Sequence, residues 1–202
     1  SQGNYLVRQS IFNAIKANTG NFVAGFNERR NSYEVNLGGI TMVWDEQKNA
    51  WVGGRSYNAE FFSNAGVDLV SFYNGKLYLH EANSLACNFY GVQYKARLWI
   101  VGNWQLFNKV YKALWMKSKT PWYAYDILNT VGQKSIIDKV RFSKREGIWY
   151  AAFRRDMNTV NIRNPIVDGK EMRDIAILVK LENDSVEYDF VNYIILNQIE
   201  SK

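Results

Sequence analysis

The chain has 202 residues, of which 47% are hydrophobic and 15% aromatic, and its formal net charge is +6. This composition excludes a disordered chain, and the length allows a substantial core in one β-rich domain of residues 1–202. Cys87 is the one cysteine, so thiols supply neither an intramolecular disulfide nor a zinc cluster. We expect Cys87 to be buried and unreactive. No apolar run approaches the ~18 residues of a membrane helix, so we expect no membrane segment.

The excess of basic residues forms no continuous stripe that could follow a phosphate backbone. Each short basic group has an acidic residue beside it, which is typical of solvated loops. We therefore predict no specific nucleic-acid binding. The groups are Arg29–Arg30 beside Glu28, Lys144–Arg145 beside Glu146, and Arg154–Arg155 beside Asp156.

In chain order, we expect residues 1–20 to form an N-terminal arm, with Ile11–Lys16 as a short helical candidate. A second candidate for one helical turn is Gln105–Val110. Wherever a longer pattern exists, apolar and polar residues alternate with a period of two, which predicts strands with one buried face. The clearest cases are Phe22–Phe26, Tyr94–Val101 and Ile175–Leu181. The alternation predicts an all-β fold.

A repeated hairpin pattern is the most informative regularity. In each copy, a strand that ends near an aromatic or apolar residue meets a short polar turn, and another aromatic or apolar residue opens the returning strand. Aromatic residues at such flanks can stabilise the strand pair across the ladder. The five predicted hairpins are Phe26–Tyr33, Trp44–Trp51, Phe72–Tyr78, Phe142–Trp149 and Leu181–Tyr188.

Turn chemistry supports these hairpins. Asn74–Gly75 is the strongest signal, because a two-residue type I′ turn needs positive φ at both central positions. Tyr73 and Lys76 should then pair across the strands. In the longer turns, Asn31, Asn49 and Gly147 can adopt the left-handed conformation that closes the loop.

Consecutive antiparallel hairpins without helices between them are typical of propeller-like blades and of β-sandwiches. At about 40 to 50 residues per blade, the chain has room for about four blades. Both architectures remain open.

The connections are Asn83–Gly91, Thr120–Trp122 and a long loop over residues 156–171. Loops of that length in a compact domain are usually functional or packed against a partner. We take Met157–Val167 as the first place to look for a contact between subunits. The alternative is a loop that folds back on its own sheet.

The sequence offers no catalytic constellation. His80 is the one histidine, and the alternation places it at a strand end, where a hydrogen-bonded structural role is favoured over that of a base. The hydrolase motif Gly-x-Ser-x-Gly, the dinucleotide glycine motif and a phosphate loop are missing. We predict no enzyme activity, no catalytic residues and no cofactor-binding residues.

Carboxylates are dispersed. Glu182, Asp184 and Glu187 form the nearest approach to a calcium site, but turn propensity explains them better, so we predict no metal ligand. No pair suited to glycoside hydrolysis stands out. The acidic residues considered are Asp45, Glu60, Asp68, Glu81, Asp126, Asp138, Asp156 and Asp174. Exposed Trp and Tyr could stack on sugar rings, although aromatics at hairpin flanks are more often core.

Several segments, in order and spacing, resemble tail muzzle and stabilisation-type virion structural proteins of crAss-like tailed phages. The similar region spans about residues 22–196. The segments are Ala50–Tyr57, Val70–His80, Asn88–Gly91, Arg145–Asp156, Ile166–Gly169, Met172–Ile175 and Lys180–Asp184.

The resemblance implies a structural protein of the phage tail, located in the virion, that assembles with other tail proteins and with copies of itself. It implies no cofactor and transfers no catalytic residue. Because such proteins are longer and this chain starts at Ser1 rather than Met, we expect it to be a C-terminal fragment.

Three alternatives remain. The first is a receptor- or glycan-binding module at the tail tip, which the many Trp and Tyr residues favour. The second is an enzyme that degrades surface polysaccharide. The third is an unrelated secreted or surface β protein of a bacterium.

Overall fold

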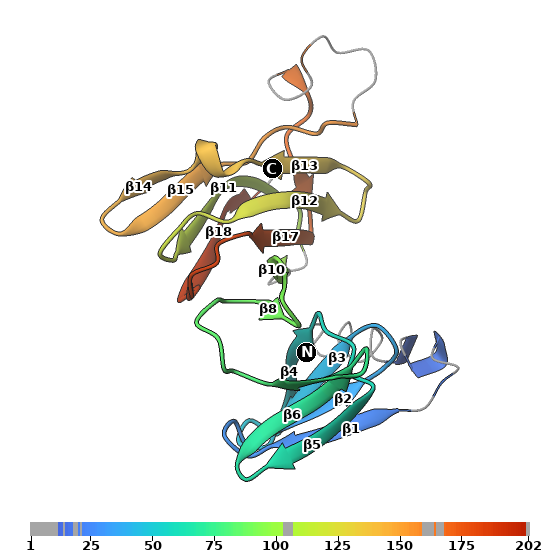
Figure 1. Cartoon of the computed structure of the whole chain (residues 1–202). Coiled ribbons are helices and arrows are strands. Elements are labelled where there is room, and N and C mark those ends of the chain that lie inside the picture. Colours follow the sequence, from blue (N-terminus) through green and yellow to red (C-terminus); the bar gives the residue numbers. More distant parts are fainter. Residues whose placement is uncertain are drawn as a thin grey trace. The chain divides into compact units, whose positions relative to one another are not determined.

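The computed structural model describes residues 12–13, 15–17, 20, 22–102, 107–158, 164 and 168–200. Antiparallel strands make up most of this part of the chain, which confirms the predicted all-β fold (Figure 1). The internal contacts separate two compact units, Ser1–Tyr94 and Lys95–Lys202. The prediction that residues 1–202 form a single domain stays a prediction. Within the described ranges, no helix is long and apolar enough to cross a membrane.

The first unit contains two antiparallel meanders and a small hairpin (Figure 1). A four-stranded sheet has the order β1-β2-β3-β4, and a three-stranded sheet has the order β5-β6-β7. The strands are β1 (Val23–Asn27), β2 (Ser32–Asn36), β3 (Thr41–Asp45), β4 (Ala50–Arg55), β5 (Phe61–Ala65), β6 (Asp68–Tyr73), β7 (Lys76–Leu79), β8 (Asn88–Phe89) and β9 (Val92–Gln93).

A small core fills the first unit, and Gly25 allows strand β1 to approach strand β5 closely. Phe62 and Leu69, from β5 and β6, are buried with Tyr57. At Gly25 of β1, an added Cβ would lie 2.6 Å from the Cβ of Phe62 and 3.1 Å from Leu69 Cδ1. Only a residue without a side chain fits this approach of β1 to β5.

The second unit has two sheets. One has the order β10-β17-β12-β13; in the other, β14 and β15 lead to β11, which also pairs with β16 and β18. The elements are β10 (Ala96–Gly102), β11 (Lys109–Lys117), β12 (Tyr123–Asn129), β13 (Lys134–Ile137), the 3-10 turn η1 (Lys139–Arg141), β14 (Ser143–Arg145), β15 (Ile148–Ala152), β16 (Arg173–Asp174), β17 (Ile177–Asn183) and β18 (Tyr193–Glu200).

The two sheets of this unit enclose one core, so the unit is a sandwich. Leu114 and Leu196 come from one sheet, and Val179 and Ile127 come from the other. Buried and half-buried positions alternate strictly along β17, as expected for a strand with one face on the core. Of the two architectures that the sequence allowed, the sandwich describes the second unit, while β1–β4 form a four-stranded meander like a single blade.

Four of the five predicted hairpins are present. They join β1 to β2, β3 to β4, β6 to β7 and β14 to β15. Tyr73 and Lys76 pair as predicted, and the turn between them has φ of 49° at Asn74 and 69° at Gly75. Asn31, Asn49 and Gly147 also adopt positive φ, which confirms the predicted left-handed turn positions.

The fifth predicted hairpin, Leu181–Tyr188, is wrong. Strand β17 ends at Asn183, and the chain continues to β18, which pairs with β11 in the other sheet. The reason is the buried Asn183 side chain, which accepts a hydrogen bond from the Ser185 amide (3.1 Å) and donates one to Asp189 Oδ2 (3.2 Å). These bonds shape an irregular loop instead of a returning strand.

The helical candidates had mixed outcomes. Phe12, Asn13 and residues 15–17 are helical, in agreement with the candidate Ile11–Lys16, and most of the predicted arm, residues 1–20, lies outside the described residues. The candidate Gln105–Val110 is wrong where it is described, because Lys109 and Val110 begin β11. Pairing with β16 and β18 on both sides overrides the weak helical pattern there.

The ends of the predicted long loop, residues 156–171, lie side by side. The Asp156 amide donates to the Lys170 carbonyl (2.8 Å), and the Arg155 guanidinium donates to the Gly169 carbonyl (3.1 Å). Residues 159–163 and 165–167, and with them most of the predicted contact segment Met157–Val167, lie outside the described residues.

We expect Gly25→Ala to destabilise the first unit by about 1 to 3 kcal/mol, the usual cost of overpacking a core. The physical reason is the 2.6 Å approach to Phe62 Cβ, which no rotamer change can relieve. Urea denaturation monitored by circular dichroism measures the loss. The matched control is Ala24→Val, because Ala24 is exposed on the same strand. Equal stability of the two variants would contradict the close approach.

Candidate functional site

A buried carboxylate lies at the centre of the first unit. Glu34 on β2 is only 2% exposed. Its two oxygens accept hydrogen bonds from the Tyr57 hydroxyl and from Asn27 Nδ2, the latter at 3.4 Å. Burial, together with the nearby Glu34 charge, raises the pKa of Tyr57 far above its ordinary value, so the phenol keeps its proton and donates a hydrogen bond to Glu34.

A second polar chain lies in the same unit. His80 Nε2 is 2.7 Å from Ser71 Oγ, and Ser71 Oγ is 2.8 Å from the Tyr90 hydroxyl. A serine beside a histidine is the first requirement of a nucleophilic site. Ser71, however, has no exposed surface, so a substrate cannot reach its hydroxyl in this conformation. The arrangement satisfies polar groups that would otherwise be buried without partners.

Aromatic rings pack around this polar chain. The Tyr57 ring centroid lies 4.8 Å from that of His80 and 5.1 Å from that of Phe89. Tyr73 and Tyr90 are stacked at 4.8 Å. His80 follows directly after β7, so the prediction that it is a hydrogen-bonded residue at a strand end is confirmed. The cluster connects the strands of the first unit to one another.

A different kind of surface covers the second unit. Strand register places Trp99 opposite Lys180 and Arg97 opposite Glu182, all on the side of the sheet away from the core. On the next strand, Lys180 is opposite Asp126. We call this surface the Trp99 face and define it as Arg97, Trp99, Tyr123, Tyr125, Asp126, Lys180 and Glu182.

Trp99 is the prominent side chain of this face, with 60% of its surface exposed. Its Nε1 donates to the Tyr125 hydroxyl at 3.2 Å, and Lys180 Nζ lies 5.6 Å from the centroid of its ring. The indole is therefore oriented on both sides while much of it remains open to solvent.

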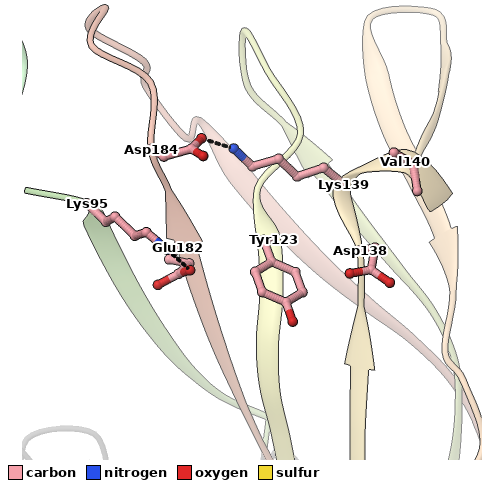
Figure 2. A pocket seen from close by; sticks show the side chains of 7 residues that line it. All are labelled: Lys95, Tyr123, Asp138, Lys139, Val140, Glu182 and Asp184. Carbon is pink, nitrogen blue, oxygen red and sulfur yellow. Dashed lines mark hydrogen bonds and ion pairs between the residues drawn. The ribbon is translucent and has the colours of Figure 1, made fainter.

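A shallow pocket of about 360 Å³ adjoins the Trp99 face and shares Tyr123 and Glu182 with it (Figure 2). Lys95 donates to Glu182 at 2.7 Å, and Lys139 pairs with Asp184 across the opening (Figure 2). Its volume lies within the range of small-molecule sites, but its walls are mainly charged side chains. Its lining residues are Lys95, Tyr123, Asp138, Lys139, Val140, Glu182 and Asp184.

The three acidic residues considered for calcium do not converge. Glu182 pairs with Lys95, Asp184 with Lys139, and Glu187 with Lys119. Over the described parts of the chain, no group of three or more potential metal-ligating side chains occurs. Each of these carboxylates has a lysine as its partner instead of a shared cation.

Two further aspartates hold loops in place. Asp189 Oδ2 accepts hydrogen bonds from Thr120 Oγ1 (2.6 Å) and from Trp122 Nε1 (3.3 Å). Burial acts to raise the pKa of Asp189, but these bonds and those from the loop amides outweigh it, so the pKa lies below its ordinary value. Asp174 binds the Thr130 hydroxyl and amide, each at 2.6 Å. Both carboxylates are thus occupied by donors from segments that are distant in the sequence.

Cys87 is half-buried, less than expected from the sequence. Burial raises the pKa of its thiol, against a weaker opposite effect of Arg55. A raised pKa reduces the thiolate fraction at neutral pH and so agrees with the expectation of an unreactive thiol.

Sequence reasoning found His80 but missed the Trp99 face. The alternation in Tyr94–Val101 already placed Arg97, Trp99 and Val101 on one side of a strand. The charge of Arg97 is the signal that could have found the face. Because Trp99 lies on the same side of the strand as Arg97, while Leu98 and Ile100 on the other side pack on the core, the side of Trp99 faces solvent.

Comparison with protein-family models gave no match to this chain, and comparison with curated protein sequences gave none either. The functional proposals therefore depend on the residues, on their geometry and on the resemblance of the sequence segments.

We expect the stability of the chain to fall as the pH drops from about 7 to about 5.5, because His80 must bind a proton in a half-buried site. Burial lowers the pKa of His80, although Glu34 acts to raise it. With a folded pKa below the unfolded value of ~6.5, the unfolded state binds more protons in this window, so stability is present above it and lost below it. Urea titrations at each pH measure the effect.

The control is His80→Gln, which can still hydrogen-bond to Ser71 but cannot titrate. Its stability should be nearly constant over the same window. His80 is the one histidine, so its ring protons give a single NMR titration curve. A native-state pKa at or above ~6.5 would show that burial does not dominate.

Proposed function

We propose that the chain is a non-catalytic structural component of a phage tail, at the tail tip, where it assembles with copies of itself and with other tail proteins. The segments that resemble tail proteins coincide with secondary structure. Ala50–Tyr57 contains β4, Val70–His80 contains β7, and Arg145–Asp156 contains β15. This distribution supports a structural role, because residues that carry the resemblance lie in strands and turns.

The observation that carries the assembly part of the proposal is the outer edge of β18, while the tail location depends on the resemblance. This strand is eight residues long and pairs with β11 along one side over Lys109–Lys117. On its other side, no strand of the described chain pairs with it. An edge without a neighbouring strand among the described residues can accept a strand from another subunit.

The side chains of β18 do not protect this edge. Ile195 is 39% exposed and Ile199 is 52% exposed, and the strand carries one charge, at Glu200. The opposite edge of the same sheet differs, because β14 has only three residues and includes Lys144 and Arg145. Short, charged edges resist association, and long apolar edges favour it. The asymmetry indicates one edge suited to assembly and one suited to solvent.

We expect Ile195→Lys combined with Ile199→Lys to reduce self-association, because two ammonium groups oppose the docking of another strand at the β18 edge. Analytical ultracentrifugation should show the wild-type chain partly as larger species and the double variant as a monomer. Because both positions are exposed, we expect stability to change little, by about 0.5 kcal/mol per substitution.

The matched control is Val131→Lys combined with Val186→Lys, two exposed valines of the same unit outside β18. This variant should associate like the wild type. A wild-type chain that is a highly stable monomer in sedimentation and thermal melting would count strongly against assembly through this edge.

The tail location has a separate test. On this proposal a tailed phage encodes the sequence, and virions of that phage can be purified and their tails isolated. Mass spectrometry should then detect the chain in the tail fraction. Detection only in infected-cell lysate, and never in virions, would exclude a structural role in the tail.

A further inference from the structure

We propose that the Trp99 face binds an acidic glycan, with a sugar ring stacked on Trp99 and the sugar carboxylate bound by the neighbouring basic residues. This binding function does not depend on the assembly role of β18. Three features of the face and its border carry it: a fixed and exposed aromatic ring, an excess of positive charge once the bordering Lys95 and Lys134 are counted, and closely alternating hydrogen-bond donors and acceptors.

The first feature is the indole of Trp99. A large aromatic side chain usually loses most of its exposure in a core, yet this one keeps 60% while Leu98 and Ile100 beside it pack inward. The hydrogen bond to Tyr125 and the ammonium of Lys180 hold the ring in one orientation. A ring that is already ordered can stack on the apolar C–H face of a sugar with little further loss of entropy.

The second feature is charge. Glu182 lies between two cations, with Lys95 Nζ at 2.7 Å and Arg97 Nε at 3.8 Å. Asp126 also lies between two cations, with Lys180 Nζ at 2.7 Å and Lys134 Nζ at 3.5 Å. Two of these four cations, Lys95 and Lys134, border the Trp99 face, and together the four share two carboxylates, which leaves an excess of two positive charges on the face and its border.

This excess selects for a negatively charged ligand. Arg97 is the cation best placed to bind it, since its side chain is 63% exposed and its contact with Glu182 is the longest of the four. Arginine also binds carboxylates with two parallel hydrogen bonds, which makes it suited to a uronic or sialic acid.

The third feature distinguishes a glycan from a nucleic acid. A phosphate backbone offers only acceptors, so Glu182 and Asp126 would repel it. Sugar hydroxyls both donate and accept hydrogen bonds, so they can use the carboxylates and the ammonium groups together. The alternation of charges along this face therefore favours a glycan.

The adjoining pocket extends the site for a longer chain. Lys95, Tyr123 and Glu182 belong both to its lining and to the surroundings of Trp99 (Figure 2). Lys139 and Asp184 form a further cation–carboxylate pair at its opening. A second sugar unit can therefore follow the first along the sheet and find donors and acceptors of the same kind.

The test uses the full chain and a set of sialylated and uronic-acid oligosaccharides, each with a carboxyl-reduced counterpart of the same sequence. Calorimetry should show saturable binding of at least one acidic oligosaccharide and binding at least about tenfold weaker for its reduced form. Trp99→Ala should weaken binding of the acidic oligosaccharide by about tenfold or more. Arg97→Gln should remove most of the preference for the acidic form over the carboxyl-reduced form.

The matched control is Phe190→Ala, which removes an aromatic side chain that is 76% exposed in the same unit but outside the Trp99 face. It should bind like the wild type. Circular dichroism and thermal melting check that each variant is folded. Trp99 Nε1–H gives a second measurement, because ligand binding should shift its NMR signal.

Four results would overturn the proposal. The first is failure of the wild type to bind any member of the set. The second is equal binding of the acidic and reduced forms, and the third is full binding by folded Trp99→Ala. The fourth is binding of single-stranded DNA in preference to the oligosaccharides, lost in Trp99→Ala, which would assign the face to nucleic acid.

Discussion

The period-two alternation of β17 is the constraint on which the second unit and its surface depend. Ile177, Val179 and Leu181 are at most 1% exposed and fix the strand against the core. A shift of the strand pairing by one residue would move all three side chains to the solvent-facing side of the sheet, so the register is strongly specified. The same register sets Lys180 opposite Trp99, and so the core determines which charges surround the indole.

Turn chemistry made much of the fold predictable, because it acts within a few residues. Asn74 and Gly75 specify a tight turn whatever lies around them, and the structure contains it. Leu181–Tyr188 looked similar in sequence, but its course depends on Asn183 bonding to Asp189 and Thr120. Thr120 is distant in the sequence, so no local pattern could show that the chain leaves the sheet there.

The candidate site was less predictable for a related reason. Alternation tells which residues share one side of a strand, but it does not tell which side meets the core. From its residue type alone, the Trp99 side chain is expected to be largely buried, whereas in the structure much of it is exposed. Arg97 beside Trp99 is a local hint to the outer side, but the other charges of the face come from the opposite strand, where Lys180 and Glu182 point outward because Val179 and Leu181 pack inward. That pairing joins segments about eighty residues apart, so the composition of the whole face is invisible to local patterns.

The two proposed roles would reinforce each other. A shallow face with one stacked ring and a few hydrogen bonds gives modest affinity for a sugar, as the limited contact area of small ligands requires. Assembly through β18 would place several copies of the face on one particle, and simultaneous contacts with a glycan-coated surface multiply the effective affinity without new contacts. Each bond stays weak enough to release and rebind. The unprotected edge of β18 and the exposed indole of Trp99, both unfavourable in an isolated chain, would each have a partner in such an assembly.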